Sequence, residues 1–281
     1  MTTRDLILEL PYLRLAAREW GPVDGPPVLA LHGWLDNAAG FERLAPLLPD
    51  LHLVALDLAG HGRSQHLHPG GVHHFIDWAP EVVAVAEFLG WQSFALIGHS
   101  MGAGISTVVA GAFPDRVQRL VLLEGAGPLA ADASKAPAQL ASAIEDEARA
   151  AAASPRLFPD LDAAIKARLR DSDLDTDAAR LLVERGSEEV DGGVRFTHDP
   201  RLRTRSRSRL TENQVLAFLA AISCPVLAVR ALQGWPFPEE VVAARLETIQ
   251  HLETAEIEGG HHVHLTHPER VAPLINQFFA D

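Results

Sequence analysis

The sequence is poor in cysteine, in positive charge and in long apolar runs. It has one cysteine, Cys224, in 281 residues, which excludes an internal disulfide framework and is typical of a reducing compartment. Lys and Arg number 24 against 37 Asp and Glu, so the formal net charge is −13. Nucleic acid and anionic membranes require a basic face on their partner, so neither is expected here. No run reaches the roughly 18 apolar residues of a membrane span.

The beginning of the chain does not have the pattern of a secretory signal. It contains acidic residues (Asp5, Glu9) and two strand-like stretches where a signal would have a basic and then an apolar region. We therefore expect a cytoplasmic protein. Hydrophobic residues make up 47% of the chain, which is enough for one large core with or without an insertion. The oligomeric state is not indicated.

Short apolar runs bounded by turn residues predict strands. Two of them, 6–10 and 12–17, alternate like a hairpin at a sheet edge, and six others read as buried parallel strands: 28–31, 53–56, 93–97, 120–123, 225–229 and 254–257. Helical patterns lie between or after most of them, at 41–48, 76–89, 102–113, 239–249 and 269–279. This alternation predicts an α/β fold with a mostly parallel eight-stranded sheet and helices on both faces. Sites in such sheets lie at the carboxyl ends of the strands.

The alternation stops between the sixth and seventh predicted strands. Helical periodicity continues there at 138–152, 161–169 and 177–185, and no strand is clear. We therefore expect a core formed by 1–125 and 223–281, with 126–222 inserted after the sixth strand as a helical cap. Caps of this kind exclude water and shape a substrate pocket.

The most informative motif is the pentapeptide from Gly98 to Gly102, which reads G-H-S-M-G. It lies between an apolar strand and a helix of small residues, which is the context of a nucleophile elbow. A side chain at either glycine would clash where the strand and the helix close around the turn. The motif predicts that Ser100 is an exposed catalytic nucleophile.

A serine nucleophile needs a histidine base, and three histidines follow a glycine pair near the end of the chain. His261 comes directly after the glycines and is the first candidate for the base. His262 is the second candidate, and His264 is expected to pack into the following helix. The density of histidines also suggests a metal site, but carboxylate or cysteine ligands at regular spacing are lacking. We expect neither a metal nor a cofactor.

The remaining parts of such a site lie at other strand ends. Gly33 follows the strand at 28–31 and lets the backbone approach the reacting carbonyl. The backbone amides of Trp34 and Met101 are then the expected oxyanion donors, each worth about 3 kcal/mol of the barrier. Trp235 and Phe237 lie in a strand-end loop and are expected to form apolar pocket walls.

The order of these motifs resembles the α/β-hydrolase fold superfamily. The matching segments are 32–34, 57–64, 98–102 and 260–261, and the run 261–265 is also similar to the serine hydrolase-like branch. The resemblance covers nearly the whole chain and is weak only in the cap. It implies a hydrolase that works without a cofactor. Serine in place of aspartate at position 100 argues against a haloalkane dehalogenase or an epoxide hydrolase.

The acid of the triad departs from the usual pattern of that superfamily. Most members carry it in a loop after the seventh strand, where this sequence has Gly234. Some members carry it at the end of the sixth strand, where this sequence has Glu124. A carboxylate that ends an apolar strand needs a partner, which His261 provides, so Glu124 is the predicted acid. A surface glutamate at that place, and Glu239 or Glu240 as the acid, are the alternatives.

The run from Arg201 to Arg209 is the one basic patch. It is either a solvated segment paired with acidic neighbours or a place where arginines attract an anionic substrate to the pocket. The predicted function is hydrolysis of an ester-type bond in a small molecule through a Ser–His–Glu triad and an acyl-enzyme. Thioester, C–C bond, lactone, amide or peroxidation chemistry on the same site is the alternative. So is a non-catalytic binding protein, which the glycine at position 234 would support.

Overall fold

The computed structural model describes residues 3–152, 154, 156–170 and 172–280. Eight strands form one sheet, in the order β1 (Thr3–Glu9), β2 (Arg14–Trp20), β4 (His52–Asp57), β3 (Pro27–Leu31), β5 (Phe94–His99), β6 (Val117–Leu123), β9 (Val226–Gln233) and β10 (Leu252–Gly260). The two N-terminal strands pair antiparallel with each other, and β2 pairs antiparallel with β4. Every other pairing in the sheet is parallel. The expected mostly parallel eight-stranded sheet is confirmed.

The central strands are buried on both faces because their side chains alternate between two cores. In β3, Leu29 and Leu31 belong to one core, whereas Val28 and Ala30 belong to the other. Such strands read as continuous apolar runs, which is why the sequence predicts them.

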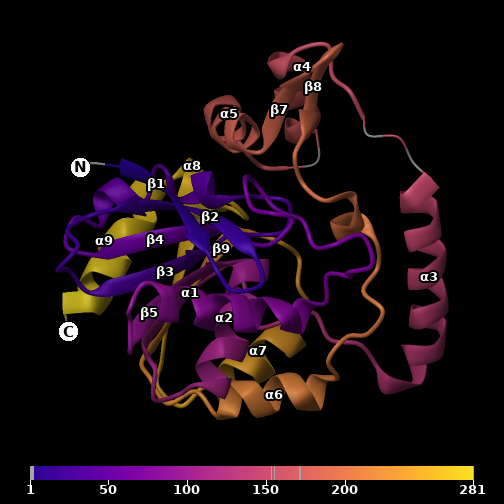
Figure 1. Ribbon diagram of the computed structural model, residues 1–281. Helices are drawn as coiled ribbons and strands as arrows, with labels where there is room; N and C mark the ends of the chain where they lie inside the picture. The colour runs from indigo at the N-terminus through magenta and orange to yellow at the C-terminus, as the bar shows by residue number, and fades with distance from the viewer. Residues whose placement is uncertain (1–2, 153, 155, 171, 281) are drawn as a thin grey trace.

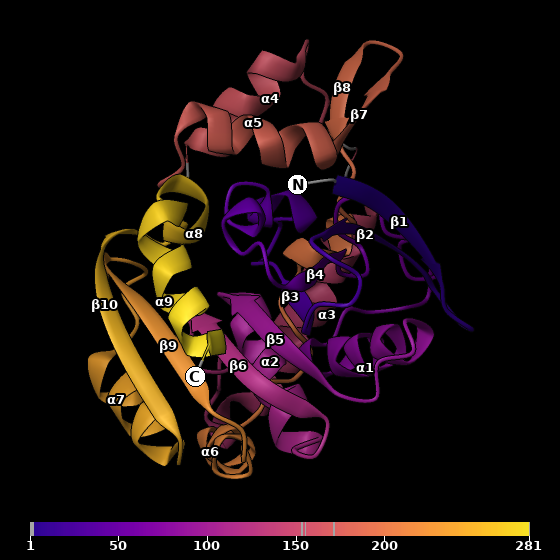
Figure 2. The same ribbon diagram turned by 90° about the vertical axis from the view of Figure 1, so that its left-hand side faces the viewer.

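Helices cover both faces of the sheet, as expected (Figures 1 and 2). The first core includes side chains of α1 (Trp78–Phe88), α2 (Met101–Ala112) and α6 (Glu212–Ala220), and α7 (Glu239–Thr248) packs beside α6. The second core includes α9 (Pro268–Ala280), which follows the short α8 (Val263–Thr266).

The helix predicted at 41–48 is wrong. Two short 3₁₀ turns stand there, η1 (Ala38–Phe41) and η2 (Ala45–Leu47). Pro46 lies at the start of the second turn and has no N–H to continue an α-helix, so the segment breaks. Its apolar side chains Phe41, Leu44 and Leu48 are nevertheless buried in the second core. The apolar residues of this segment therefore have helical spacing because one side of the segment is buried, although the segment does not form a regular helix.

The segment between β6 and β9 contains α3 (Ala136–Ala152), α4 (Leu161–Leu169), α5 (Thr176–Arg185), the turn η5 (Pro200–Arg203) and α6. The expectation that it has no strand is wrong, because β7 (Ser187–Val190) and β8 (Gly193–Phe196) form an antiparallel hairpin. Its strands are short, and only β8 shows apolar alternation, at Val194 and Phe196. The Asp191–Gly192 turn between the strands is a further local signal of a hairpin. Two further short turns are η3 (Phe75–Asp77) and η4 (Ala133–Lys135).

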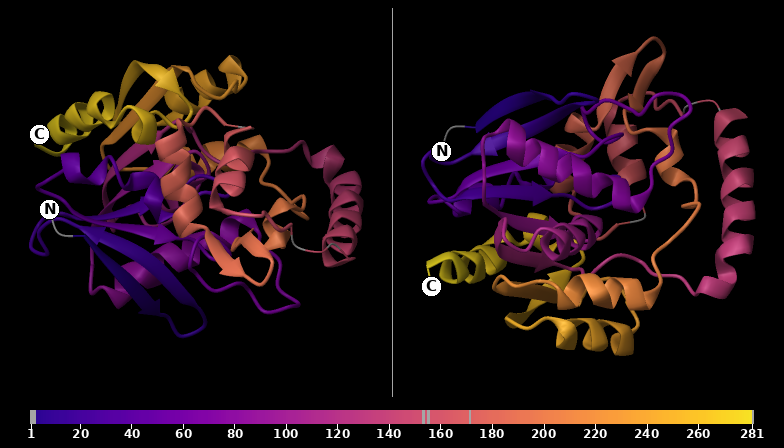
Figure 3. Two further views of the ribbon diagram at one scale, coloured as in Figure 1. Left: turned by 90° about the horizontal axis from the view of Figure 1, so that it is seen from above. Right: turned by 60° about the horizontal axis from the view of Figure 1, so that its bottom comes forward.

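Within this inserted segment, α4, α5 and the hairpin lie together at one end of the molecule, and α3 stands at its side (Figures 1 and 3). The first group has a small core of its own, which includes Phe158, Ile165, Leu182 and Val194. Leu265 of α8 joins that core and ties the group to the main body. In the part of the chain that is described, no helix is both long and apolar enough to cross a membrane.

Candidate active site

Ser100 stands on a sharp turn between β5 and α2. Its backbone has φ 52°, a left-handed conformation that is uncommon outside glycine. A Cβ on Gly98 would lie 2.6 Å from the Cα of Ala103, and one on Gly102 would lie 2.8 Å from the carbonyl oxygen of His32. Both positions therefore require glycine. The turn holds the Ser100 side chain at the N-terminus of α2, where the helix dipole favours negative charge.

His261 lies between Ser100 and Glu124 and bonds to both. Its Nε2 is 2.9 Å from the Ser100 Oγ, and its Nδ1 is 3.1 Å from the Glu124 Oε2. The Glu124 carboxylate accepts a hydrogen bond from Nδ1–H, so the proton of the neutral ring stays on Nδ1 and Nε2 is free to accept the hydroxyl proton of the serine. The three residues come from the ends of β5, β6 and β10, which are far apart in the chain.

Glu124 is buried, with 6% of its surface exposed, at the end of β6. Besides His261, its carboxylate accepts hydrogen bonds from the backbone amides of Ala231, at 2.6 Å, and Trp235, at 3.1 Å. These three donors satisfy the carboxylate and fix its orientation. The alternative acid Glu239 instead forms an ion pair with Arg230, at 2.8 Å.

The structure directs the ring of His262, the second candidate for the base, away from Ser100. It lies between Asp36, whose Oδ2 is 3.4 Å from Nε2, and Asp173, whose Oδ1 is 2.5 Å from Nδ1. His264 is buried and packs against the ring of Phe41. Asp36 and Asp173 were missed by sequence reasoning, since neither belongs to a motif.

The other predicted site residues surround this group at the strand ends. A Cβ on Gly33 would lie 2.9 Å from the Nδ1 of His99, so this turn approaches the elbow closely. Trp34 follows it, and its indole donates to the carbonyl of Leu202 in η5, at 2.9 Å. The ring of Trp235 is 5.7 Å from that of His261. Phe237 is half-buried on the same loop, and its place in a pocket wall stays a prediction.

Asp57, a further strand-end acid, is fully buried and supports loops away from Ser100. It accepts hydrogen bonds from the amides of Ala38, at 2.7 Å, and Arg63, at 2.9 Å. Its charge is balanced by Arg185 of α5, at 2.9 Å. This ion pair attaches the inserted segment to the end of β4.

The arginine run is largely engaged with acidic partners. Ion pairs join Arg201 to Asp199 at 2.7 Å, Arg205 to Asp146 at 3.0 Å, and Arg207 to Glu147 at 2.6 Å. The latter two tie the run to α3. These contacts favour the structural reading of the run over recognition of an anionic substrate.

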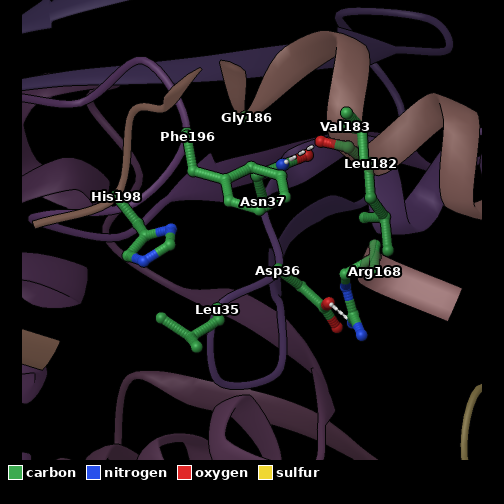
Figure 4. Close-up of a pocket in the computed structure, with 10 residues that line it drawn as sticks. Leu35, Asp36, Asn37, Arg168, Leu182, Val183, Gly186, Phe196 and His198 are labelled. Carbon is green, nitrogen blue, oxygen red and sulfur yellow. Dashed lines mark hydrogen bonds and ion pairs between the residues drawn. The ribbon is translucent and has the colours of Figure 1, made fainter. Parts of the chain in front are cut away.

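Figure 4 shows a small hollow lined by Leu35, Asp36 and Asn37 and by residues of the inserted segment. Its volume is about 20 Å³, room for about one water molecule. Arg168 of α4 points there at the carboxylate of Asp36, at 2.6 Å, and Asn37 donates to the carbonyl of Leu182. The inserted segment therefore contacts the predicted oxyanion loop directly.

Comparisons with known proteins identify the fold and the relatives of this chain. A family model described as the alpha/beta hydrolase fold matches residues 26–268. The "Serine hydrolase-like protein" of Danio rerio is 33% identical over 282 residues, which span 96% of this chain and 86% of that protein. The crystal structure of the hypothetical protein PA1622 from Pseudomonas aeruginosa PAO1 is 43% identical, with a TM-score of 0.94 and 99% of each chain covered. The "Thioesterase Domain From Curacin Biosynthetic Pathway" is 28% identical, with a TM-score of 0.85 and coverage of 98% and 99%.

Proposed function

The chain belongs to the α/β-hydrolase fold family, and on this premise we propose that it is a serine hydrolase that cleaves an ester-type bond of a small molecule. The observation that carries the proposal is the hydrogen-bonded series Ser100–His261–Glu124, with distances of 2.9 and 3.1 Å. This is the arrangement that activates a serine hydroxyl for attack on a carbonyl carbon.

The first step forms an acyl-enzyme. The Ser100 Oγ attacks the carbonyl carbon while its proton passes to the Nε2 of His261. The resulting imidazolium is stabilised by the buried carboxylate of Glu124, which does not itself take the proton. The tetrahedral intermediate then collapses, and the imidazolium gives its proton to the departing alcohol oxygen.

Two backbone amides stabilise the negative charge on the tetrahedral intermediate by donating hydrogen bonds to it. The amide of Met101 lies at the first residue of α2, and that of Trp34 lies in the turn against the elbow. Donors held in place before the reaction need no reorganisation as the charge develops. A water molecule, deprotonated by His261, then hydrolyses the acyl-enzyme and regenerates Ser100.

We also propose that the inserted segment 126–222, apart from α6, which packs on the sheet, acts as a cap over this site. The contacts that support this role are those of Leu202 with Trp34, at 2.9 Å, and of Arg168 with Asp36, at 2.6 Å. Both join the inserted segment to the loop that provides the Trp34 amide. The exposed face of Trp235, with 60% of its surface accessible, would contact an apolar part of the substrate at the opening.

The proposal is tested with a fluorophosphonate probe and a series of p-nitrophenyl esters of increasing acyl length. We expect covalent labelling at Ser100, turnover of at least one ester, and loss of both in Ser100→Ala. A folded wild-type protein that takes no label at Ser100 would contradict the proposal and favour a binding protein on a hydrolase scaffold.

Thioester hydrolysis is a second candidate, favoured by the 28% identity to the curacin thioesterase domain over nearly the whole chain. The same triad performs it, with a thiolate as the leaving group. Oxoesters and thioesters with the same acyl chain separate the two: kcat/KM at least about tenfold higher for the thioester would assign this chemistry.

A further inference from the structure

We propose that His262 is a positioning residue whose protonated ring bridges Asp36 and Asp173. The bridge fixes the oxyanion loop, at 33–36, relative to the loop that carries the base, at 259–262. The inference rests on the proposed function, because it assigns this bridge a role in the reaction at Ser100. It concerns residues outside the triad, and it links the inserted segment to both catalytic loops.

One side of the bridge is Asp173, in the connection between α4 and α5. Its carboxylate accepts two hydrogen bonds from the same residue, from the His262 backbone amide at 2.9 Å and from Nδ1 at 2.5 Å. A Cβ on Gly260 would lie 2.9 Å from the Asp173 Cγ. The second glycine of the pair before the base therefore leaves room for this carboxylate.

The other side is Asp36, which is buried with 4% of its surface exposed. Its backbone amide donates to the carbonyl of Gly33, at 3.1 Å, and closes the turn that presents the Trp34 amide. Its Oδ2 lies 3.4 Å from the Nε2 of His262, while Arg168 binds its Oδ1 at 2.6 Å. A single imidazole thus connects the turn of the oxyanion donor with the residue next to the base.

The charges of this group balance only when His262 is protonated. Asp36 and Asp173 then face the two cations His262 and Arg168. Burial by itself would lower the pKa of His262, because it disfavours the charged ring. The negative charges of Asp36 and Asp173 and their hydrogen bonds to the ring outweigh this effect and raise the pKa of His262 to about 9. The same cations hold the pKa of Asp36 well below its usual range against the effect of burial.

Three other imidazole rings lie near His262: two are buried and neutral, and the third belongs to His261, the proposed base. His99 from β5 and His264 from α8 are buried, and burial together with the neighbouring imidazoles lowers the pKa of each. His261 is 5.4 Å from His262 between ring centroids. His99 also donates from Nε2 to the carbonyl of His261, at 2.8 Å, and so supports the same loop.

Loss of the His262 proton leaves a net negative charge beside the place where the oxyanion develops. The transition state then loses electrostatic stabilisation, and the two loops lose a common anchor. We expect the reaction at Ser100 to slow as the pH rises through about 9.

The test compares wild type, His262→Gln and Asp173→Asn by two readouts. NMR titration of the ring nitrogens should place the His262 midpoint near pH 9 in wild type and at least about one pH unit lower in Asp173→Asn. The rate of fluorophosphonate labelling of Ser100 at pH 8 should fall by about 10- to 100-fold in both variants. The decline on the alkaline side should disappear in His262→Gln and begin at lower pH in Asp173→Asn.

Asp175→Asn is the matched control. Asp175 lies on the same connection and anchors it through Arg43, at 2.9 Å. In the described part of the chain its side-chain hydrogen bonds go to Arg43 and to the Ala178 amide, and so to neither catalytic loop. Asparagine also retains the N-cap of α5, so both readouts should stay at wild-type values. A His262 ring that titrates near the ordinary value, or an unchanged alkaline decline in Asp173→Asn, would overturn the inference. Absence of labelling at every pH would instead overturn the proposed function, while the ring titration would still decide whether the bridge exists.

Discussion

The carboxyl group of Glu124 occupies the space that a side chain at Gly234 would need. A Cβ on Gly234 would lie 2.6 Å from the Glu124 Cδ and 2.7 Å from its Oε1. The loop after β9 is where most members of the superfamily are expected to carry the acid. Here that loop provides Gly234 and the Trp235 amide, while a second amide donor, Ala231, lies in β9 itself. Because β6 and β9 are neighbours and pair in parallel, their carboxyl ends meet at one edge. An acid from either strand end can therefore reach the same point.

The Glu124→Gln variant should remain folded and lose most of its activity. The amide keeps the shape and one acceptor, but it neither stabilises the imidazolium nor fixes the tautomer of His261 as a carboxylate does. We expect kcat to fall by about 10³- to 10⁴-fold with little change in KM. Steady-state kinetics with the best p-nitrophenyl ester measure this fall in kcat. Near-wild-type turnover would remove Glu124 from the triad.

The Gly234→Ala variant should also impair turnover, because the added methyl group displaces the Glu124 carboxylate from His261. We expect a loss of about 10²-fold in kcat, in line with an ångström-scale misplacement of a catalytic group. The double variant Glu124→Gly with Gly234→Asp should be more active than Glu124→Gly alone, since it returns a carboxylate to the same space.

Gly70→Ala serves as the control for glycine replacement, because its Cβ would meet only the His68 side chain, at 3.3 Å or more. It should retain wild-type kcat. Full activity in Gly234→Ala would show that the carboxylate does not have to occupy this space.

The ion pair between Arg185 and Asp57 should be the strongest single attachment of the inserted segment. Arg185 is 4% exposed and Asp57 is fully buried, so Arg185→Met leaves an unpaired buried carboxylate. We expect the free energy of unfolding to drop by about 3–5 kcal/mol. Urea denaturation measures it, with Arg180→Met as the control, since Arg180 forms exposed pairs worth about 1 kcal/mol or less. Equal effects of the two substitutions would contradict the prediction.

Glu81 should make the stability of the protein depend on pH. Burial raises the pKa of Glu81 to about 8, against the hydrogen bond that its carboxylate accepts from the Ala59 amide. The folded state then keeps a proton that the unfolded state releases near the ordinary glutamate pKa of 4.5. The contribution of Glu81 to stability therefore falls as the pH rises from about 4.5 to about 8.

In Glu81→Gln this loss should be absent. We expect similar melting temperatures of variant and wild type at pH 4, and a variant more stable by about 2 kcal/mol or more at pH 8. Glu87→Gln, exposed on the same helix, controls for the change from acid to amide. A Glu81→Gln protein that is not stabilised at pH 8 would show that Glu81 folds as a carboxylate.

The prediction of the fold succeeded where the residues that determine an element are neighbours in the sequence. The buried strands read as apolar runs because both their faces are covered, and Gly98 and Gly102 mark the elbow because that turn leaves no room for a Cβ. The helix predicted at 41–48 failed because burial of one face, and not a regular helix, spaces its apolar side chains. The hairpin at 187–196 was missed because its two strands are only four residues long, although its Asp191–Gly192 turn is a local hairpin signal.

Local patterns were enough to find the strand ends that carry chemical groups: a serine between glycines, a histidine after glycines, and a glutamate that ends an apolar strand. The three-dimensional packing was needed to show that the ring of His261, and not that of His262, faces Ser100, and that Asp36 and Asp173 hold the neighbouring ring. Those choices depend on the side-chain directions of residues that are adjacent in the chain and on carboxylates more than 80 positions away, which no local pattern can encode. Parallel strand order brings the groups to one edge, and packing selects which of them meet.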